Sequence, residues 1–84
     1  MSITVYLDRE NSTAWKKGGR GEWDLSLEAK QWMNERGFTP TIWEAEPGRY
    51  EIFGSSRNDG PPGVTFAQSD SEAAMLFKLT FGGR

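Results

Sequence analysis

The chain contains neither cysteine nor histidine among its 84 residues, and this absence limits the possible folds more than any other feature. A chain of this length forms one domain, because a second domain would be too small to bury a core of its own. Without a disulfide, or a thiolate or imidazole metal site, that domain depends on one hydrophobic core. We therefore expect a single domain, residues 1–84, with a modest free energy of unfolding.

The charged side chains are nearly balanced, with 10 basic and 12 acidic residues and a formal net charge of −2. This balance provides no general attraction to nucleic acid or to anionic lipid. No apolar run approaches the ~20 residues of a membrane span, and the start "MSITVYLD" lacks the features of a signal peptide. We therefore expect a soluble, cytoplasmic protein with no membrane partner. Since histidine is absent and no EF-hand spacing occurs, we expect no metal and no cofactor.

The first half of the chain predicts one strand, one long loop and one helix. Residues 3–7, "ITVYL", alternate in polarity with period two, which is typical of a half-buried strand. Residues 8–23 show no periodicity and predict a long loop. The helix is predicted from apolar residues at helical spacing, with Asp24 or Ser26 as its N-cap and Gly37 as its C-terminal cap.

The second half predicts further strands and a second helix. Residues 39–54 form two extended runs around a turn at Pro47-Gly48, residues 55–63 form a loop, and residues 64–67 form another strand. Ser69 and Glu72 have capping-box spacing and predict the second helix, which Gly82-Gly83 would end. Residues 78–81, "KLTF", fit either the end of this helix or a short strand.

The predicted order of strands and helices indicates an α+β fold. We expect a single small sheet of about four, mainly antiparallel, strands with both helices on one face, because each helix has one apolar stripe to bury. A ferredoxin-like or split β-α-β relative fits this order best.

The C-terminal segment "VTFAQSDSEAAMLFKLTFGG" resembles the ends of short, uncharacterised proteins encoded by tailed bacteriophages. In those proteins a strand is followed by a small acidic cap, alanines, a Phe-Lys-Leu run and glycine. The resemblance covers about a quarter of the chain and rests mostly on core and capping residues. It implies a phage origin, a setting in a host cell, and a protein that binds and modulates host machinery.

The segment "WKKGGRGEW", residues 15–23, is the most distinctive part of the predicted loop. Its glycines and lysines match neither a Walker loop nor a dinucleotide-binding fingerprint, so we expect no bound nucleotide of those kinds. The segment is consistent with a protein-docking surface, with a nucleic-acid contact, or with a plain loop between packed elements. The candidate contact residues in it are Trp15, Lys16, Lys17, Arg20 and Trp23.

A second candidate surface is the sheet face opposite the helices. If Ile42 points toward the helices, then Trp43 projects from the open face, together with Tyr6 and Phe53. Exposed aromatic side chains on a sheet are typical of RNA-stacking platforms and of protein-interface hot spots. A third interpretation is that another segment covers this face.

Paired carboxylates on the predicted hairpin provide little support for catalysis. Glu44 and Glu46 share a face, but charged residues on a hairpin usually form a solvated surface. We therefore expect a non-enzymatic binding protein that docks on a host or viral protein. The alternatives are a single-stranded nucleic-acid binder that uses the same loop, and a homodimeric assembly subunit joined through the open sheet face.

Overall fold

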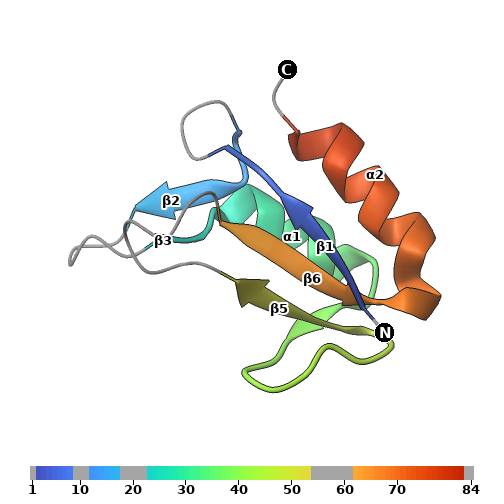
Figure 1. The fold of residues 1–84 in the computed structure, drawn as a ribbon. Helices are drawn as coiled ribbons and strands as arrows, with labels where there is room; N and C mark the ends of the chain where they lie inside the picture. The colour runs from blue at the N-terminus through green and yellow to red at the C-terminus, as the bar shows by residue number, and fades with distance from the viewer. Residues whose placement is uncertain (1, 9–11, 18–22, 54–61, 83–84) are drawn as a thin grey trace.

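The computed structural model describes residues 2–8, 12–17, 23–53 and 62–82 (Figure 1). Arg20 and nearly all of the predicted loop at residues 55–63 lie outside the described residues. The α+β class is confirmed. The strands and helices are β1 (Ser2–Tyr6), β2 (Trp15–Lys17), β3 (Trp23–Leu25), α1 (Leu27–Glu35), β4 (Thr39–Pro40), β5 (Arg49–Phe53), β6 (Gly63–Ala67), the 3₁₀ turn η1 (Gln68–Asp70) and α2 (Ser71–Phe81).

Four strands form a mixed sheet in the order β1-β6-β5-β4. β6 is antiparallel to both β1 and β5, whereas β4 runs parallel to β5. β2 and β3 form a separate antiparallel ribbon, which replaces the single sheet expected from the sequence. The more specific ferredoxin-like or split β-α-β connectivity is not established by this strand order.

One face of the sheet packs against the two helices. No described helix covers the other face, which we call the open face, although Thr65 at its centre is only 8% exposed. Val64 and Phe66 of β6 are fully buried on the helix side, and Phe66 makes ring contacts with Phe38 and with Phe77 of α2. Trp32 of α1 contacts Phe77 at 5.4 Å between ring centroids, so both helices share this core. Because side chains alternate along a strand, Thr65 and its cross-strand neighbours lie on the open face.

Helix α1 is confirmed with the caps that the sequence predicts. The Ser26 hydroxyl accepts a hydrogen bond from the N–H of Ala29 at 3.2 Å, as an N-cap residue does. At the other end Gly37 has φ of 81°. The N–H groups of Gly37 and Phe38 donate to the carbonyls of Asn34 and Met33, which completes a Schellman motif.

Helix α2 runs to Phe81, so residues 78–81 finish a helix and do not form a strand. Phe77 and Phe81 are one helical turn apart and both are buried, whereas Leu79 is exposed. The capping box predicted at Ser69 is wrong. Residues 68–70 form a 3₁₀ turn, and the N-cap is Asp70, which makes no side-chain capping bond.

The long loop predicted over residues 8–23 is also wrong in part, because it contains β2. Trp15 of β2 lies opposite Leu25 of β3, and both side chains are buried. The Trp15 indole N–H donates to the carbonyl of Leu7 at 3.1 Å. The ribbon thus attaches to the end of β1 and contributes to the core.

The turn at Pro47-Gly48 is confirmed, but the hairpin predicted around it is not formed as expected. Glu46 and Arg49 pair across the turn, and the Arg49 N–H donates to the Glu46 carbonyl at 2.8 Å. Beyond this pair the chain leaves the sheet at residues 41–45. The strand before this segment, β4, runs parallel to β5, with the Thr39 N–H donating to the Gly48 carbonyl at 3.0 Å, and the chain returns to the sheet as β5.

Candidate functional site

The open face of the sheet carries an aromatic pair at one end. Tyr6 of β1 and Phe53 of β5 both lie opposite Gly63 of β6. Their rings meet edge to face, with 6.2 Å between centroids. Both side chains remain about half exposed, at 54% and 51%. The missing side chain of Gly63 lets the two rings approach each other across the central strand.

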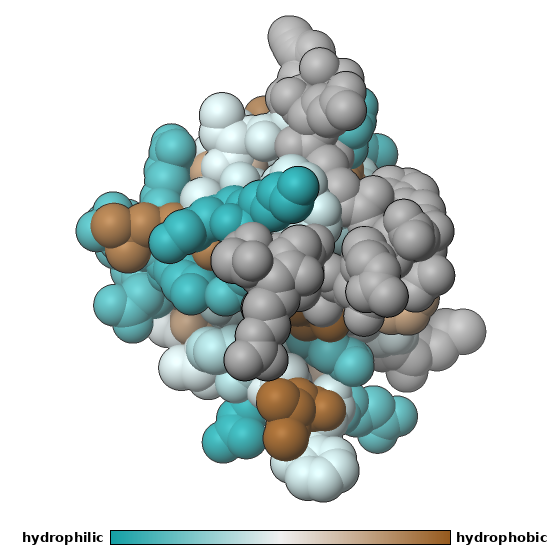
Figure 2. Space-filling view, turned by 90° about the vertical axis from the view of Figure 1, so that its left-hand side faces the viewer, coloured by the Kyte–Doolittle hydropathy of each residue, from teal (hydrophilic) through white to brown (hydrophobic). Residues whose placement is uncertain are grey.

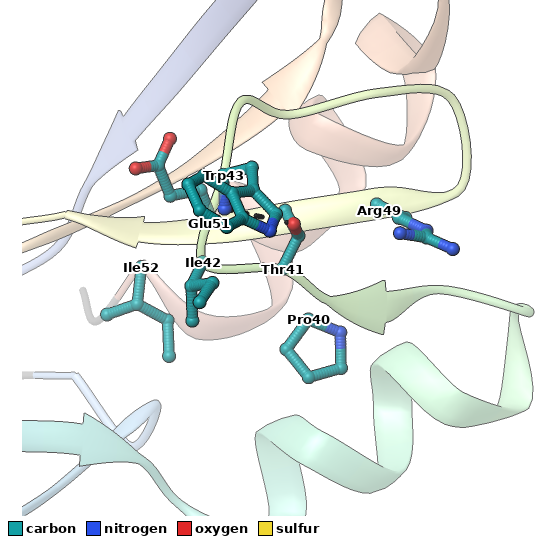
Figure 3. A pocket seen from close by; sticks show the side chains of 7 residues that line it. All are labelled: Pro40, Thr41, Ile42, Trp43, Arg49, Glu51 and Ile52. Carbon is teal, nitrogen blue, oxygen red and sulfur yellow. Dashed lines mark hydrogen bonds between the residues drawn. The ribbon is translucent and has the colours of Figure 1, made fainter.

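A groove lies at the β4 end of the same sheet (Figure 3). It has a volume of about 600 Å³ and is lined by Pro40, Thr41, Ile42, Trp43, Arg49, Glu51 and Ile52. Ile42 and Trp43 are the most exposed of these apolar side chains, at 85% and 73%. Figure 3 shows Ile42 on the side of β5 where Ile52 lies, and Trp43 on the side where Glu51 lies. Trp43 thus lies on the Glu51 side of β5, but the strand predicted to carry it is not formed, and Ile42 is exposed rather than packed under the helices as the prediction required.

Backbone hydrogen bonds hold the segment that carries Trp43. The Thr41 N–H donates to the Tyr50 carbonyl at 2.8 Å, and the Thr41 hydroxyl accepts from the Trp43 N–H at 3.1 Å. On the far side of the turn, the Gly48 N–H donates to the Asp70 carboxylate at 2.9 Å. These bonds fix the backbone that carries the exposed indole, which lowers the entropic cost of ordering this segment on binding.

We refer to Tyr6, Trp43, Arg49, Glu51 and Phe53 as the open-face surface. Arg49, Glu51 and Phe53 alternate along β5, so their side chains share one side of the sheet. In Figure 1 the segment that carries Trp43 forms the lowest part of the molecule. Figure 2 shows hydrophobic groups that protrude from the surface at its left edge and toward its lower end.

The structure separates the basic segment from this surface. Lys16 and Lys17 are exposed on β2, which Figure 1 shows at the left of the molecule, whereas residues 41–46 lie at the bottom. Trp15 is only 7% exposed and is a core residue, so its predicted role in partner contact is wrong. Trp23 is half-buried and lies opposite Lys17.

The charges around Lys16 do not favour a phosphate-binding surface. Lys16 lies directly opposite Asp24 in the ribbon. The Asp24 carboxylate also forms an ion pair with Lys30 at 3.2 Å. A carboxylate at the centre of the exposed cations opposes the approach of a nucleic-acid backbone.

Asp24 and Lys30 also line a second cavity of about 410 Å³, together with Asn34, Phe38, Thr39, Pro40, Tyr50 and Ile52. Burial of the Tyr50 side chain, assisted by the negative charge of Asp24, raises the pKa of its hydroxyl above the usual value. Tyr50 is nearly inaccessible to solvent. Its neutral phenol therefore belongs to the wall between this cavity and the core.

The acidic residues of the predicted hairpin are dispersed. Glu46 lies at the turn opposite Arg49, Glu44 is exposed in the irregular segment, and Glu51 is on β5. Within the described ranges, no three acidic side chains are grouped closely enough to hold a metal ion. Nor does any described helix have the length and apolar character needed to cross a membrane.

Comparison of the chain with protein-family models, curated proteins and solved structures found no match. The candidate site therefore rests on geometry alone. Sequence reasoning identified Tyr6, Trp43 and Phe53 as open-face residues. It missed Arg49 and the exposed position of Ile42, because both depend on the chain leaving the sheet after β4. The Pro47-Gly48 turn was the available signal for that change of direction.

Proposed function

We propose that this protein acts by binding, without catalysis, and that it docks on a partner protein through the open-face surface. The observation that carries the proposal is Trp43, which is 73% exposed on a segment fixed by hydrogen bonds and lines a groove with Arg49. The half-exposed Tyr6–Phe53 pair lies farther along the same face of the sheet. Trp, Tyr and Arg are the side chains most enriched in protein-interface hot spots.

The energetics of covering Trp43 support a specific contact. An aromatic side chain buries about 150 to 250 Å² in a complete contact, and burial of apolar area is worth about 25 cal/mol per Å². Because 73% of Trp43 is exposed, a partner that covers the indole gains about 3 to 5 kcal/mol before the entropic costs of association. Ile42 on the neighbouring rim of the groove adds further apolar area.

The partner that we propose is a host or viral protein in the cytoplasm of a bacterial cell, which the domain modulates or inhibits. The basis for this setting is the resemblance of residues 64–83 to phage proteins. A groove with one arginine and one glutamate on its rim suits a partner surface that is apolar at its centre and carries both charges at its edge.

The test compares proteins retained from bacterial lysate by the wild type, by Trp43→Ala and by Leu27→Ala. Leu27 is an equally exposed apolar residue on α1 and does not line the groove, which makes it a matched control. We expect a partner to be retained by the wild type and by Leu27→Ala but lost with Trp43→Ala. Equal retention by all three proteins, each shown to be folded by circular dichroism, would exclude the open-face surface.

A further inference from the structure

The two edges of the four-stranded sheet differ in how they are protected. β4 is two residues long and contains Pro40, and short strands with proline are features that prevent an edge from pairing with another chain. β1 has five residues, SITVY, with neither a charge nor a proline. Three of them, Ile3, Thr4 and Val5, are β-branched and favour extended structure. Among the strands that the structure describes, β1 is thus the sheet edge without these protective features.

The register of β1 identifies which backbone groups face away from the sheet. The Leu7 N–H donates to the Pro62 carbonyl at 3.0 Å, just beyond β1. Hydrogen-bonded and non-bonded pairs alternate in an antiparallel ladder, so Ile3 and Val5 also bond to β6. The N–H and C=O groups of Ser2, Thr4 and Tyr6 therefore point toward the free edge. The Tyr6 side chain stays on the open face.

Helix α2 presents apolar side chains beside this edge. Met75, Leu76 and Leu79 are all substantially exposed, Leu79 at 76%. A groove of about 460 Å³ separates α2 from β1 and is lined by Ile3, Thr4, Val5, Tyr6, Ser71, Ala74, Met75 and Lys78. Figure 1 shows α2 running alongside β1. The β1 edge and the exposed Met75 thus line one groove, and Leu76 and Leu79 lie on the exposed surface of the same helix.

This surface is complementary to itself. A two-fold axis beside Thr4 would place each Thr4 opposite its copy and each Ser2 opposite Tyr6 of the other chain, which suits the outward hydrogen-bonding groups of an antiparallel pair. The two α2 helices would then run antiparallel. If they cross near Met75, Glu72 of each chain lies opposite Lys78 of the other, since both are three residues from Met75. Neither charge has an ion-pair partner among the described residues of one chain.

We propose that the occupant of this groove is a second copy of the chain, which pairs β1 with β1 and α2 with α2. The result is an isologous dimer with a continuous eight-stranded sheet. This interface is distinct from the open-face surface and does not depend on the function proposed for it. Since each copy keeps its own Trp43 site, the dimer presents two docking surfaces and favours a partner with repeated sites.

The first test is sedimentation equilibrium over a range of concentrations, with the wild type, Thr4→Pro and Thr4→Val. Proline at this position removes an N–H that points away from β6, so it should abolish the dimer. Both substitutions remove the Thr4 hydroxyl, which bonds to the Thr65 hydroxyl at 2.9 Å. Valine keeps the backbone N–H that proline lacks, so Thr4→Val should remain dimeric. A wild type that stays monomeric at all concentrations would overturn the proposal, as would a Thr4→Pro dimer of unchanged affinity.

A charge exchange provides a second test that does not depend on proline being tolerated in β1. Glu72→Lys and Lys78→Glu should each raise the dimer dissociation constant roughly fivefold or more, because two symmetry-related pairs become repulsive. The double variant should recover most of the affinity. If the double variant is as weak as either single variant, α2 does not pair antiparallel about Met75. A monomer that instead binds extended peptides along β1 would likewise contradict self-pairing.

Discussion

Gly63 shows how one position sets the shape of the open face. A Cβ atom at this residue would lie 2.8 Å from the Val5 carbonyl oxygen and 3.1 Å from the side chains of Thr4 and Tyr6. The carbonyl belongs to the β1 backbone and cannot move without disturbing the ladder. Glycine is therefore required where the Tyr6 and Phe53 rings meet.

We expect Gly63→Ala to lower the free energy of unfolding by about 1 to 3 kcal/mol, the usual cost of overpacking. Urea denaturation of the variant and the wild type measures this difference. Ser2→Ala, at the exposed end of β1, is the control and should change stability by less than about 0.5 kcal/mol. A Gly63→Ala variant as stable as the control would show that the two strands can separate at no cost.

Tyr50 provides a prediction on pH. Its hydroxyl has a pKa above the usual value of about 10 because of burial and the nearby Asp24. The unfolded chain therefore loses this proton more readily than the folded chain does. The contribution of Tyr50 to stability is complete below about pH 10 and is lost as the pH rises above it.

Tyr50→Phe should therefore flatten the decrease in stability above pH 10 in denaturation experiments at several pH values. Tyr6→Phe, which leaves Tyr50 in place, should retain the decrease. A Tyr50→Phe profile that overlies the wild-type profile would contradict the burial of a titrating hydroxyl at this position.

The sequence could not reveal the burial of Trp15. A Trp followed by two lysines and two glycines is typical of an exposed loop, and no periodicity of two is visible in a strand of only three residues. The burial results from cross-strand pairing with Leu25, ten residues away. The exposure of Trp43 agrees with the sequence-based expectation, but its stated reason does not hold, because residues 41–45 form no strand and Ile42 is also exposed.

Among the elements, α1 was the most predictable, because its signals are local. Ser26 caps the helix start and also donates to the Thr13 carbonyl at 2.8 Å, and Gly37 ends the helix. The boundary of α2 was less predictable. "SDSE" has capping-box spacing, but the chain first makes a 3₁₀ turn, and the Asp70 carboxylate instead binds the Gly48 N–H.

The difference between the capped start of α1 and the uncapped start of α2 can be measured with two serine substitutions. Ser26→Ala should cost about 1 to 2 kcal/mol, because it removes the cap and the bond to the ribbon. Ser69→Ala should cost less than about 0.5 kcal/mol, because Ser69 is exposed in the 3₁₀ turn and is not the N-cap of α2. Urea denaturation of both variants gives the two values. Equal losses of stability in the two variants would indicate that Ser69 also caps its helix, as the sequence predicted, and would contradict the structure at that position.

The packing of α2 explains why residues 78–81 form the end of a helix and not the short strand that the sequence also allowed. Phe77, Leu79 and Phe81 alternate as in a strand, but Phe77 and Phe81 are also one helical turn apart. In the structure both phenylalanines pack on Trp32, and Leu79 is left exposed. The choice depends on a tertiary contact with α1, which periodicity alone does not contain.

At the scale of the whole molecule, the two proposed surfaces lie on different parts of the sheet. The open-face surface uses side chains on the uncovered side, whereas the β1 edge uses outward backbone groups and one side of α2. Lys16 and Lys17 do not line the groove that carries Trp43, although Asp24 of the same ribbon shares a cavity with Pro40 and Ile52 of that groove. Replacing the two lysines and replacing Trp43 should therefore have independent effects on binding.

The affinity of the captured partner for Trp43→Ala and for the double variant Lys16→Ala/Lys17→Ala tests the central claim most directly. We expect Trp43→Ala to weaken binding at least about 30-fold, which corresponds to a hot spot of about 2 kcal/mol. The lysine variant should bind as the wild type does, with little dependence on salt. Loss of binding in the lysine variant, with Trp43→Ala unaffected, would contradict the account and would place the interface on the basic ribbon.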